Sequence, residues 1–132
     1  MEAKKREIGT LGGIREMVDL FYGKVRNDDL LGPVFDKRIG DHWDVHLDKM
    51  YRFWQTVLLQ EHRYQGSPFT PHASMPIGAA HFRRWLQLFE ETLEENFTGE
   101  KAEEARWRAA KMAEMFQLKI AYYRDHSIHP IG

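Results

Sequence analysis

The amino-acid sequence predicts an all-α protein with four main helices and one long interruption near its middle. Apolar side chains recur at intervals of three or four residues, which is the spacing of helices that bury one face. No segment shows the sustained apolar–polar alternation that is typical of a strand. A length of 132 residues suits one domain, so we expect residues 1–132 to form it, with 126–132 as a frayed tail.

The first helix is predicted from the apolar spacing between Leu11 and Val25, and Thr10 is in place to cap its start. Residues 27–40 follow, with glycine and proline among them, and these residues interrupt regular structure. We therefore expect an irregular crossing connection there, anchored by a buried Phe35.

The second helix is expected to start near Asp41, which would be its N-cap with Asp44 three residues later, and to end near Gln60. Residues 61–78 then hold three prolines and two glycines, too many breakers for a long helix. The sequence predicts a structured turn region in this interval. A simple helix bundle has shorter connections, which suggests that something occupies this side of the domain.

Two further helices complete the predicted fold. The third has an apolar face made of Phe82, Trp85, Leu86, Phe89 and Leu93. Thr98 and Gly99 should end it. The last helix is expected from Ala102 to Tyr123, and its small apolar residues allow another helix to approach closely.

Composition and charge exclude several classes of function. A formal net charge of -1 provides no attraction to a polyanion, so nucleic-acid binding is not expected. The absence of cysteine excludes disulfides, thiolate nucleophiles and cysteine-bound metals. No apolar run resembles a signal peptide or a membrane span, so we expect a cytoplasmic protein without a membrane partner.

Four of the seven histidines are candidates for chemistry. His46 shares a helical face with Met50, Phe53 and Trp54, but a buried histidine is more often hydrogen-bonded core than ligand. His42 and His46 have the i, i+4 spacing of a helical metal-binding pair, which keeps a non-haem metal site open.

The other two candidates lie in and just after the central interruption. His72 lies between Pro71 and Pro76, in a stiff segment that could present an imidazole to a cofactor, while His81 starts the third helix. Spacing alone does not decide between His72 and His81 as a ligand.

Five stretches of the chain, taken in order, resemble the group III truncated haemoglobins and together span nearly its whole length. They are LFYGKV, DDLLGPVF, WDVHLDKMYRFW, YQGSPFTPH and HFRRWLQLFEET. The resemblance implies a truncated globin fold, in which a two-over-two helical sandwich surrounds haem. It also implies that His72 is the iron ligand and that His81 only begins a helix.

The same resemblance implies roles for other residues around haem b. Tyr22, His46 and Trp85 would hydrogen-bond a bound diatomic ligand such as dioxygen or nitric oxide, and Phe35 would contact the haem. The remaining candidate wall residues are apolar: Met50, Phe53, Trp54, Ile77, Phe82, Leu86 and Phe89. We expect slow ligand release, which suits redox chemistry with nitric oxide or peroxide; turnover would need a separate reductase because the chain has no flavin or nicotinamide domain.

Two alternatives to a haem protein stay open on the residues alone. One is a non-haem helical metal protein that uses His42 and His46, and the other is a cofactor-free interaction module in which the same side chains fill a core. For the haem protein we expect a monomer.

Overall fold

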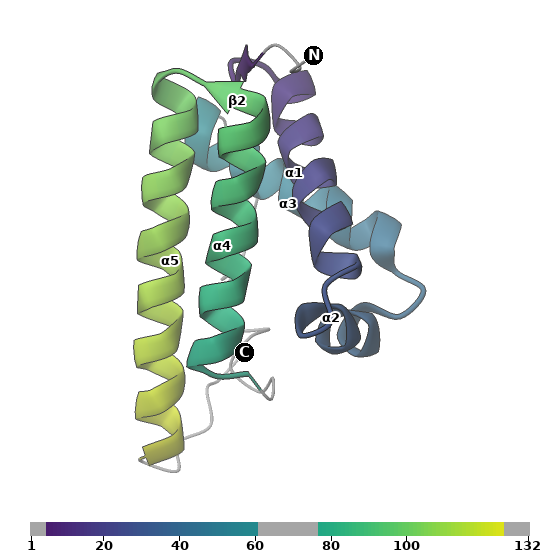
Figure 1. Cartoon of the computed structure of the whole chain (residues 1–132), viewed down its shortest axis with the longest axis vertical. Helices are drawn as coiled ribbons and strands as arrows, with labels where there is room; N and C mark the ends of the chain where they lie inside the picture. The colour runs from purple at the N-terminus through teal and green to yellow at the C-terminus, as the bar shows by residue number, and fades with distance from the viewer. Residues whose placement is uncertain (1–4, 61–76, 126–132) are drawn as a thin grey trace.

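The computed structural model describes residues 5–60 and 77–125, and within these ranges the protein consists of five helices and one pair of two-residue strands (Figure 1). This confirms the predicted all-α class. The elements are β1 (Arg6–Glu7), α1 (Leu11–Arg26), α2 (Leu31–Ile39), α3 (Trp43–Leu59), α4 (Ala79–Asn96), β2 (Phe97–Thr98) and α5 (Glu100–Asp125).

Helix α1 begins where the sequence predicts. The Thr10 side chain accepts a hydrogen bond from the Gly13 N–H at 3.3 Å, so it satisfies one of the unpaired amides of the first turn. The apolar stripe of α1 faces inward, and Ile14, Val18 and Val25 are buried. The apolar face of α1 is therefore part of the hydrophobic core.

Helix α2 corrects the prediction of an irregular connection over 27–40. The Asp28 carboxylate accepts hydrogen bonds from the N–H groups of Leu30 (3.1 Å) and Leu31 (3.0 Å), which caps a new helix. Pro33 lies in the first turn, where its missing N–H costs no hydrogen bond. Gly40 ends the helix with a φ of 59°, a value that favours glycine. The breakers thus frame a short helix.

The junction between α1 and α2 is tightly packed. A Cβ atom at Gly32 would lie 2.9 Å from the carbonyl oxygen of Arg26, so only glycine fits there without a shift of the backbone. Asp28, which is buried, also forms an ion pair with Arg84 of α4, with 2.5 Å between Oδ1 and Nε. These contacts hold α2 against the long helices.

Helix α3 starts later than expected. Its N-cap is His42, which makes no side-chain capping bond, so the predicted cap at Asp41 is wrong. Its end agrees with the sequence, because Gln60 is the C-cap and adopts the left-handed conformation (φ 57°). Lys101 of α5 donates to the Leu58 carbonyl at 2.7 Å, satisfying a terminal acceptor of α3.

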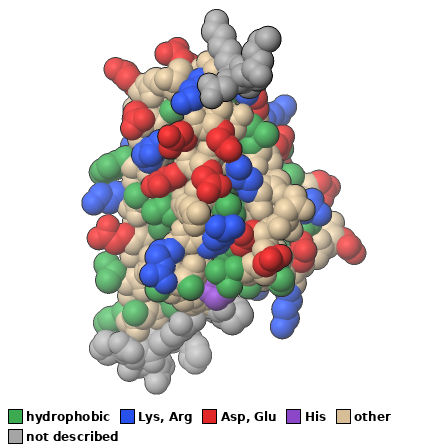
Figure 2. Space-filling view, in the orientation of Figure 1, with side chains coloured by type: hydrophobic (Ala, Val, Ile, Leu, Met, Phe, Trp, Pro, Cys, Tyr) green, Lys and Arg blue, Asp and Glu red, His purple; other side chains and the backbone are tan. Residues whose placement is uncertain are grey.

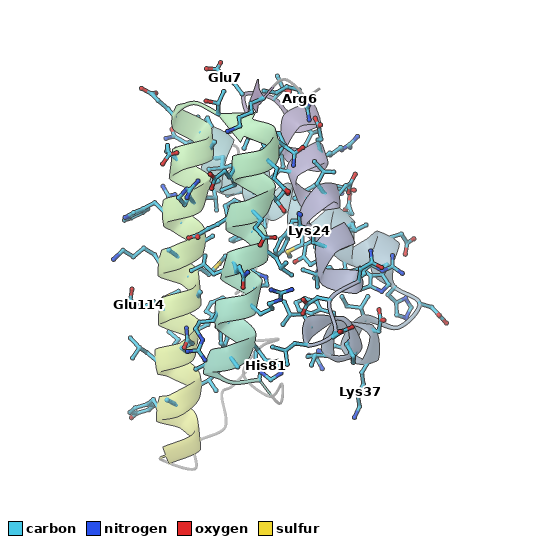
Figure 3. The ribbon with its side chains drawn as sticks, viewed as in Figure 1. Arg6, Glu7, Lys24, Lys37, His81 and Glu114 are labelled. Carbon is cyan, nitrogen blue, oxygen red and sulfur yellow. The ribbon has the colours of Figure 1, made fainter. Side chains whose placement is uncertain are left out.

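The helices pack as two pairs, α1 with α3 and α4 with α5, and the pairs meet mainly where α1 packs on α4 (Figure 1). Lys24 of α1 reaches across this contact (Figure 3), with its Nζ 2.8 Å from Glu95 Oε1. β1 and β2 pair in parallel and tie the N-terminal segment to the α4–α5 corner. Such a brief pair carries no sequence alternation.

The outer surface has charges of both signs mixed with scattered apolar side chains, as Figure 2 shows for one face. None of the helices in the described ranges is both long and apolar enough to cross a membrane. Three sequence predictions lie wholly or largely outside the described residues: His72, nearly all of the turn region 61–78, and the tail 126–132.

Candidate functional site

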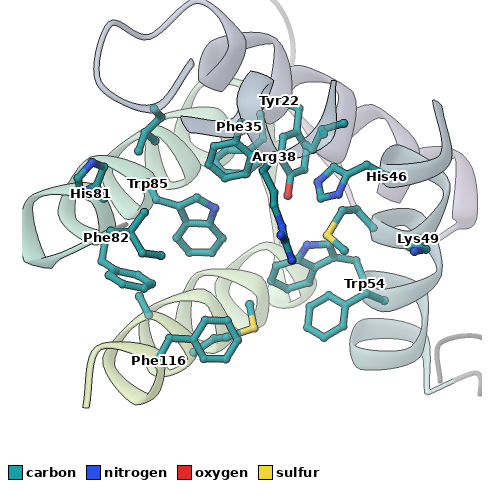
Figure 4. Close-up of a pocket in the computed structure, with 18 of the residues that line it drawn as sticks. Tyr22, Phe35, Arg38, His46, Lys49, Trp54, His81, Phe82, Trp85 and Phe116 are labelled. Atoms are coloured by element: carbon teal, nitrogen blue, oxygen red, sulfur yellow. The ribbon is translucent and has the colours of Figure 1, made fainter. Parts of the chain in front are cut away.

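A cavity of about 420 Å³ opens among the helices, and side chains from all five of them line it (Figure 4). This volume lies in the range of roughly 300–1,000 Å³ that is typical of sites for small molecules and cofactors. Six of the apolar residues predicted as cofactor contacts line it: Phe35, Met50, Phe53, Trp54, Ile77 and Phe82. The sequence therefore identifies much of the apolar lining.

Two other predicted wall residues, Leu86 and Phe89, are not among the described residues that line the cavity. Phe89 is fully buried, and its ring stacks on Trp54 (5.1 Å between centroids) and on Trp85 (5.7 Å). Leu86 packs, partly buried, against the same core. Phe89 therefore supports two lining side chains from behind. Helical spacing predicts the buried face but does not separate its first layer from its second.

Three polar side chains enter this apolar cavity from three helices. Tyr22 comes from α1, His46 from α3 and Trp85 from α4, and all three line the same space (Figure 4). The rings of Tyr22 and His46 meet edge to face, with 5.0 Å between their centroids. The structure thus brings together the three residues that the resemblance singles out, although they are far apart in the sequence.

The environment of Tyr22 fixes its protonation state. Its side chain is 6% exposed, and burial raises the pKa of the phenol above its ordinary value of 10.0. The hydroxyl points into the cavity (Figure 4), and no hydrogen bond from it is found within the described ranges. Tyr22 is therefore a neutral phenol that presents its O–H to the cavity.

A basic edge borders the cavity, and two of its three residues, Arg38 and Lys49, were not predicted from the sequence. Arg38, His42 and Lys49 all line the cavity and are exposed, so they lie where it opens to solvent. A signal for them exists in the sequence: His42 and Lys49 lie four residues before and three after His46, and Arg38 lies three after Phe35. The sequence analysis uses this spacing for His42, as a possible metal ligand, and the same spacing also points to Arg38 and Lys49.

His81 lines the cavity but has a structural task. Its Nδ1 accepts a hydrogen bond from the Gly78 N–H at 3.1 Å, at the start of α4. This geometry is what the prediction of a helix-start residue requires. It leaves one ring nitrogen for any other role.

The described residues offer little to a non-haem metal. Over 5–60 and 77–125 no group of three or more histidine, aspartate or glutamate side chains is arranged to hold a metal ion. His42 and His46 both line the cavity, but within these ranges no carboxylate completes the pair. The alternative of a helical two-histidine site therefore lacks support from this part of the chain.

Comparisons with known proteins identify the family of the chain. Residues 6–120 match the family model described as "Bacterial-like globin". The chain is 36% identical over 117 residues to the "Group 3 truncated hemoglobin ctb" of Campylobacter jejuni, and the match covers 86% of this chain and 92% of that protein.

The fold is similar to a solved structure as well. A crystal structure of a group III truncated haemoglobin from Campylobacter jejuni superimposes with a TM-score of 0.81 at 35% sequence identity. The superposition covers 89% of this chain and 95% of that one. Sequence and structure thus point to one family over most of the chain.

Proposed function

Because the chain belongs to the bacterial-like globin family and is a group III truncated haemoglobin, we propose that its cavity holds haem b and binds a diatomic ligand such as dioxygen or nitric oxide. One observation carries the proposal: an apolar cavity into which Tyr22, His46 and Trp85 converge from three helices. Convergent polar groups in an apolar pocket are the usual mark of a ligand site.

The lining of the cavity fits the chemistry of haem b. The cofactor is a flat, largely apolar ring that carries two carboxylates at one edge. Aromatic and aliphatic side chains such as Phe35, Phe53 and Phe82 match the ring, while Arg38 and Lys49 provide positive charge for the carboxylates. Positive groups at the opening and apolar groups inside are the distribution that this molecule needs.

We propose His72 as the residue that holds the iron. This assignment rests on the resemblance of YQGSPFTPH to the family pattern, since His72 lies outside the described residues. The hydrogen bond from the Gly78 N–H to His81 Nδ1 supports it indirectly, because it gives the competing histidine a helix-capping role. A neutral imidazole is the usual globin ligand.

Bound haem supplies an iron ion with one position open to a small ligand. The protein's own contribution is hydrogen bonding in a water-poor cavity. Tyr22 stays protonated at every physiological pH and can donate its O–H, the indole N–H of Trp85 can only donate, and the His46 imidazole can donate or accept. Donors in an apolar site favour ligands that carry partial negative charge, so dioxygen should be released slowly.

Reconstitution with haemin and an absorption spectrum test the proposal. We expect a Soret band and, after reduction, a shift of the ferrous spectrum on adding carbon monoxide. His72→Ala should abolish the spectrum of the native complex, whereas His81→Ala should leave it largely intact. A colourless protein that does not respond to haemin would refute haem binding, and the reverse pattern in the two variants would refute the ligand assignment.

Redox chemistry is a finer hypothesis about the same site. Slow release of dioxygen would give nitric oxide time to react with it, and an external reductase would then restore the ferrous protein. Rapid mixing of the oxygenated protein with nitric oxide should produce nitrate. If no nitrate forms, the protein is an oxygen-binding globin without this activity.

A further inference from the structure

Three aromatic rings next to the cavity form a closed triangle. His46 meets Tyr22 at 5.0 Å and Trp43 at 5.8 Å between centroids, with interplanar angles of 90° and 89°. Tyr22 and Trp43 complete the triangle at 6.0 Å and 66°. Each ring thus presents an edge to a neighbour's face, the arrangement that aromatic quadrupoles prefer.

Trp43 is the corner of this triangle that stands outside the cavity. Tyr22 and His46 line the cavity, while Trp43 is not among the described residues that do. Trp43 lies one helical turn before His46 on α3, so the two side chains share a face of that helix. It is 8% exposed, which leaves it little room to move away.

Two other elements of the fold hold the Trp43 indole in place. Its Nε1 donates a hydrogen bond to Asp36 Oδ1 of α2 at 3.2 Å. The guanidinium of Arg26, at the end of α1, lies over the ring with Cζ 4.4 Å from the centroid, within cation–π range. The indole is therefore fixed at its edge by one helix and at its face by another.

We propose that Trp43 is a positioning residue, which together with Tyr22 confines the His46 imidazole to the cavity. The inference rests on the proposed function, because it assigns Trp43 an influence on the ligand bound there. The His46 imidazole cannot rotate away from Tyr22 without giving up a ring contact on both sides. Asp36 and Arg26 make Trp43 a fixed support, so α1 and α2 both determine where the imidazole points.

A double-mutant cycle on ligand release tests this. In the haem-loaded protein, Trp43→Phe should change the dioxygen dissociation rate by about two- to tenfold, the range that corresponds to the worth of an aromatic pair. The same substitution in a His46→Ala background should have no further effect, because Trp43 acts through the imidazole. Asp36→Ala, which leaves the triangle itself intact, should shift the rate in the same direction by less.

An NMR measurement reports on the imidazole without relying on ligand kinetics. In the carbon monoxide complex, which is diamagnetic, we expect cross-relaxation between the His46 ring protons and those of Tyr22, and a marked loss of it in Trp43→Phe. Trp107→Phe is the matched control, since that indole is 58% exposed on α5 and should leave both readouts unchanged.

The outcomes separate the positioning role from ordinary packing. If Trp43→Phe changes the rate equally with and without His46, or leaves the His46–Tyr22 cross-relaxation intact, the inference is wrong and Trp43 only fills the core. If the protein takes up no haem, the proposed function fails first. The same cross-relaxation measured on the haem-free chain then decides the positioning role by itself.

Discussion

Removal of the Asp28 carboxylate should loosen the wall of the cavity that α2 provides. Asp28 accepts hydrogen bonds from the amides of Leu30 and Leu31 and pairs with Arg84 of α4, so a single side chain joins the start of α2 to a long helix. Helix α2 carries Phe35, which lines the cavity. We therefore expect Asp28→Ala to lower both the stability of the fold and the affinity for haem.

The size of the effect follows from the contacts that would be lost. A lost helix cap costs about 0.5–2 kcal/mol. Arg84 is 40% exposed, so water screens much of the ion pair, which adds only about 0–1 kcal/mol. Together they predict a loss of about 2 kcal/mol in the free energy of unfolding at pH 7, or roughly 7 °C in Tm for a chain of this size. The loss for Asp28→Asn should be smaller than that for Asp28→Ala, because the amide oxygen of asparagine can still accept hydrogen bonds from the backbone N–H groups of Leu30 and Leu31.

The pH dependence provides an independent check. Burial alone would raise the pKa of Asp28, but the Leu31 amide, the Arg84 guanidinium and the Leu30 amide outweigh it, and the pKa lies below the ordinary 3.8. A carboxyl whose pKa is lowered by folding stabilises the protein above its unfolded pKa. That contribution is lost as pH falls through the folded pKa. The difference between the native protein and Asp28→Ala should therefore shrink below pH 3.8.

Thermal unfolding followed by circular dichroism at pH 7 and at pH 3 measures both effects, with all proteins in the same haem state. The matched control is Asp29→Ala, which removes an exposed carboxylate from the neighbouring position. We expect the control to change the free energy of unfolding by less than about 0.5 kcal/mol. The reasoning fails if Asp28→Ala resembles Asp29→Ala at pH 7, or if its effect is the same at both pH values.

Three further predictions test the site, the core and the helix junction. Tyr22→Phe should speed dioxygen release by roughly tenfold in stopped-flow experiments, because it removes one hydrogen bond to a partly charged ligand; an unchanged rate would assign the stabilisation to the other donors. Phe89→Ala should lower the free energy of unfolding in urea by about 3–5 kcal/mol, since the ring is fully buried, and a loss under 1 kcal/mol would contradict its supporting role. Gly32→Ala should cost about 1–3 kcal/mol because of the Arg26 carbonyl, whereas Gly23→Ala, with nothing near its Cβ position, should stabilise the protein by up to about 1 kcal/mol. If both glycine variants changed the free energy of unfolding in the same direction, the predicted clash between a Cβ at position 32 and the Arg26 carbonyl would be refuted.

Helix α2 shows why part of the fold escapes prediction from the sequence. Gly32, Pro33 and Gly40 are correctly recognised as breakers, but a breaker at a helix end is compatible with the helix that it borders. The Asp28 side chain accepts hydrogen bonds from the first amides of this helix locally, and packing against α1 and α4 adds tertiary support that the sequence pattern does not reveal. The long helices carry their own period and need no such support, so their faces are predictable.

The candidate site divides in a similar way. The residues that converge on the cavity could be identified from family-like stretches, because LFYGKV and WDVHLDKMYRFW carry Tyr22 and His46 at recognisable positions. The sequence does not show, however, whether a residue of the buried face lines the cavity or lies behind its lining. Phe82 lines the cavity and Phe89 lies behind it, although both belong to one apolar face of α4. Only the packing of Phe89 against two tryptophan rings separates them.

The hydroxyl of Tyr22 should lower the stability of the haem-free fold, and its proposed hydrogen bond to the ligand explains why a tyrosine stands at this position. Within residues 5–60 and 77–125 no side chain is found to pair with the Tyr22 hydroxyl, and a buried hydroxyl that lacks a partner costs about 1–3 kcal/mol relative to a paired one. A phenylalanine at this position would keep the ring contacts with Phe21 and Phe35 and avoid that cost. Tyr22→Phe should therefore leave the haem-free protein as stable or more stable, while it weakens the hold on the ligand. A residue that serves the ligand at the expense of the core is under functional rather than structural constraint. If Tyr22→Phe destabilised the haem-free protein instead, the hydroxyl would belong to the fold and this reading of the cavity would be wrong.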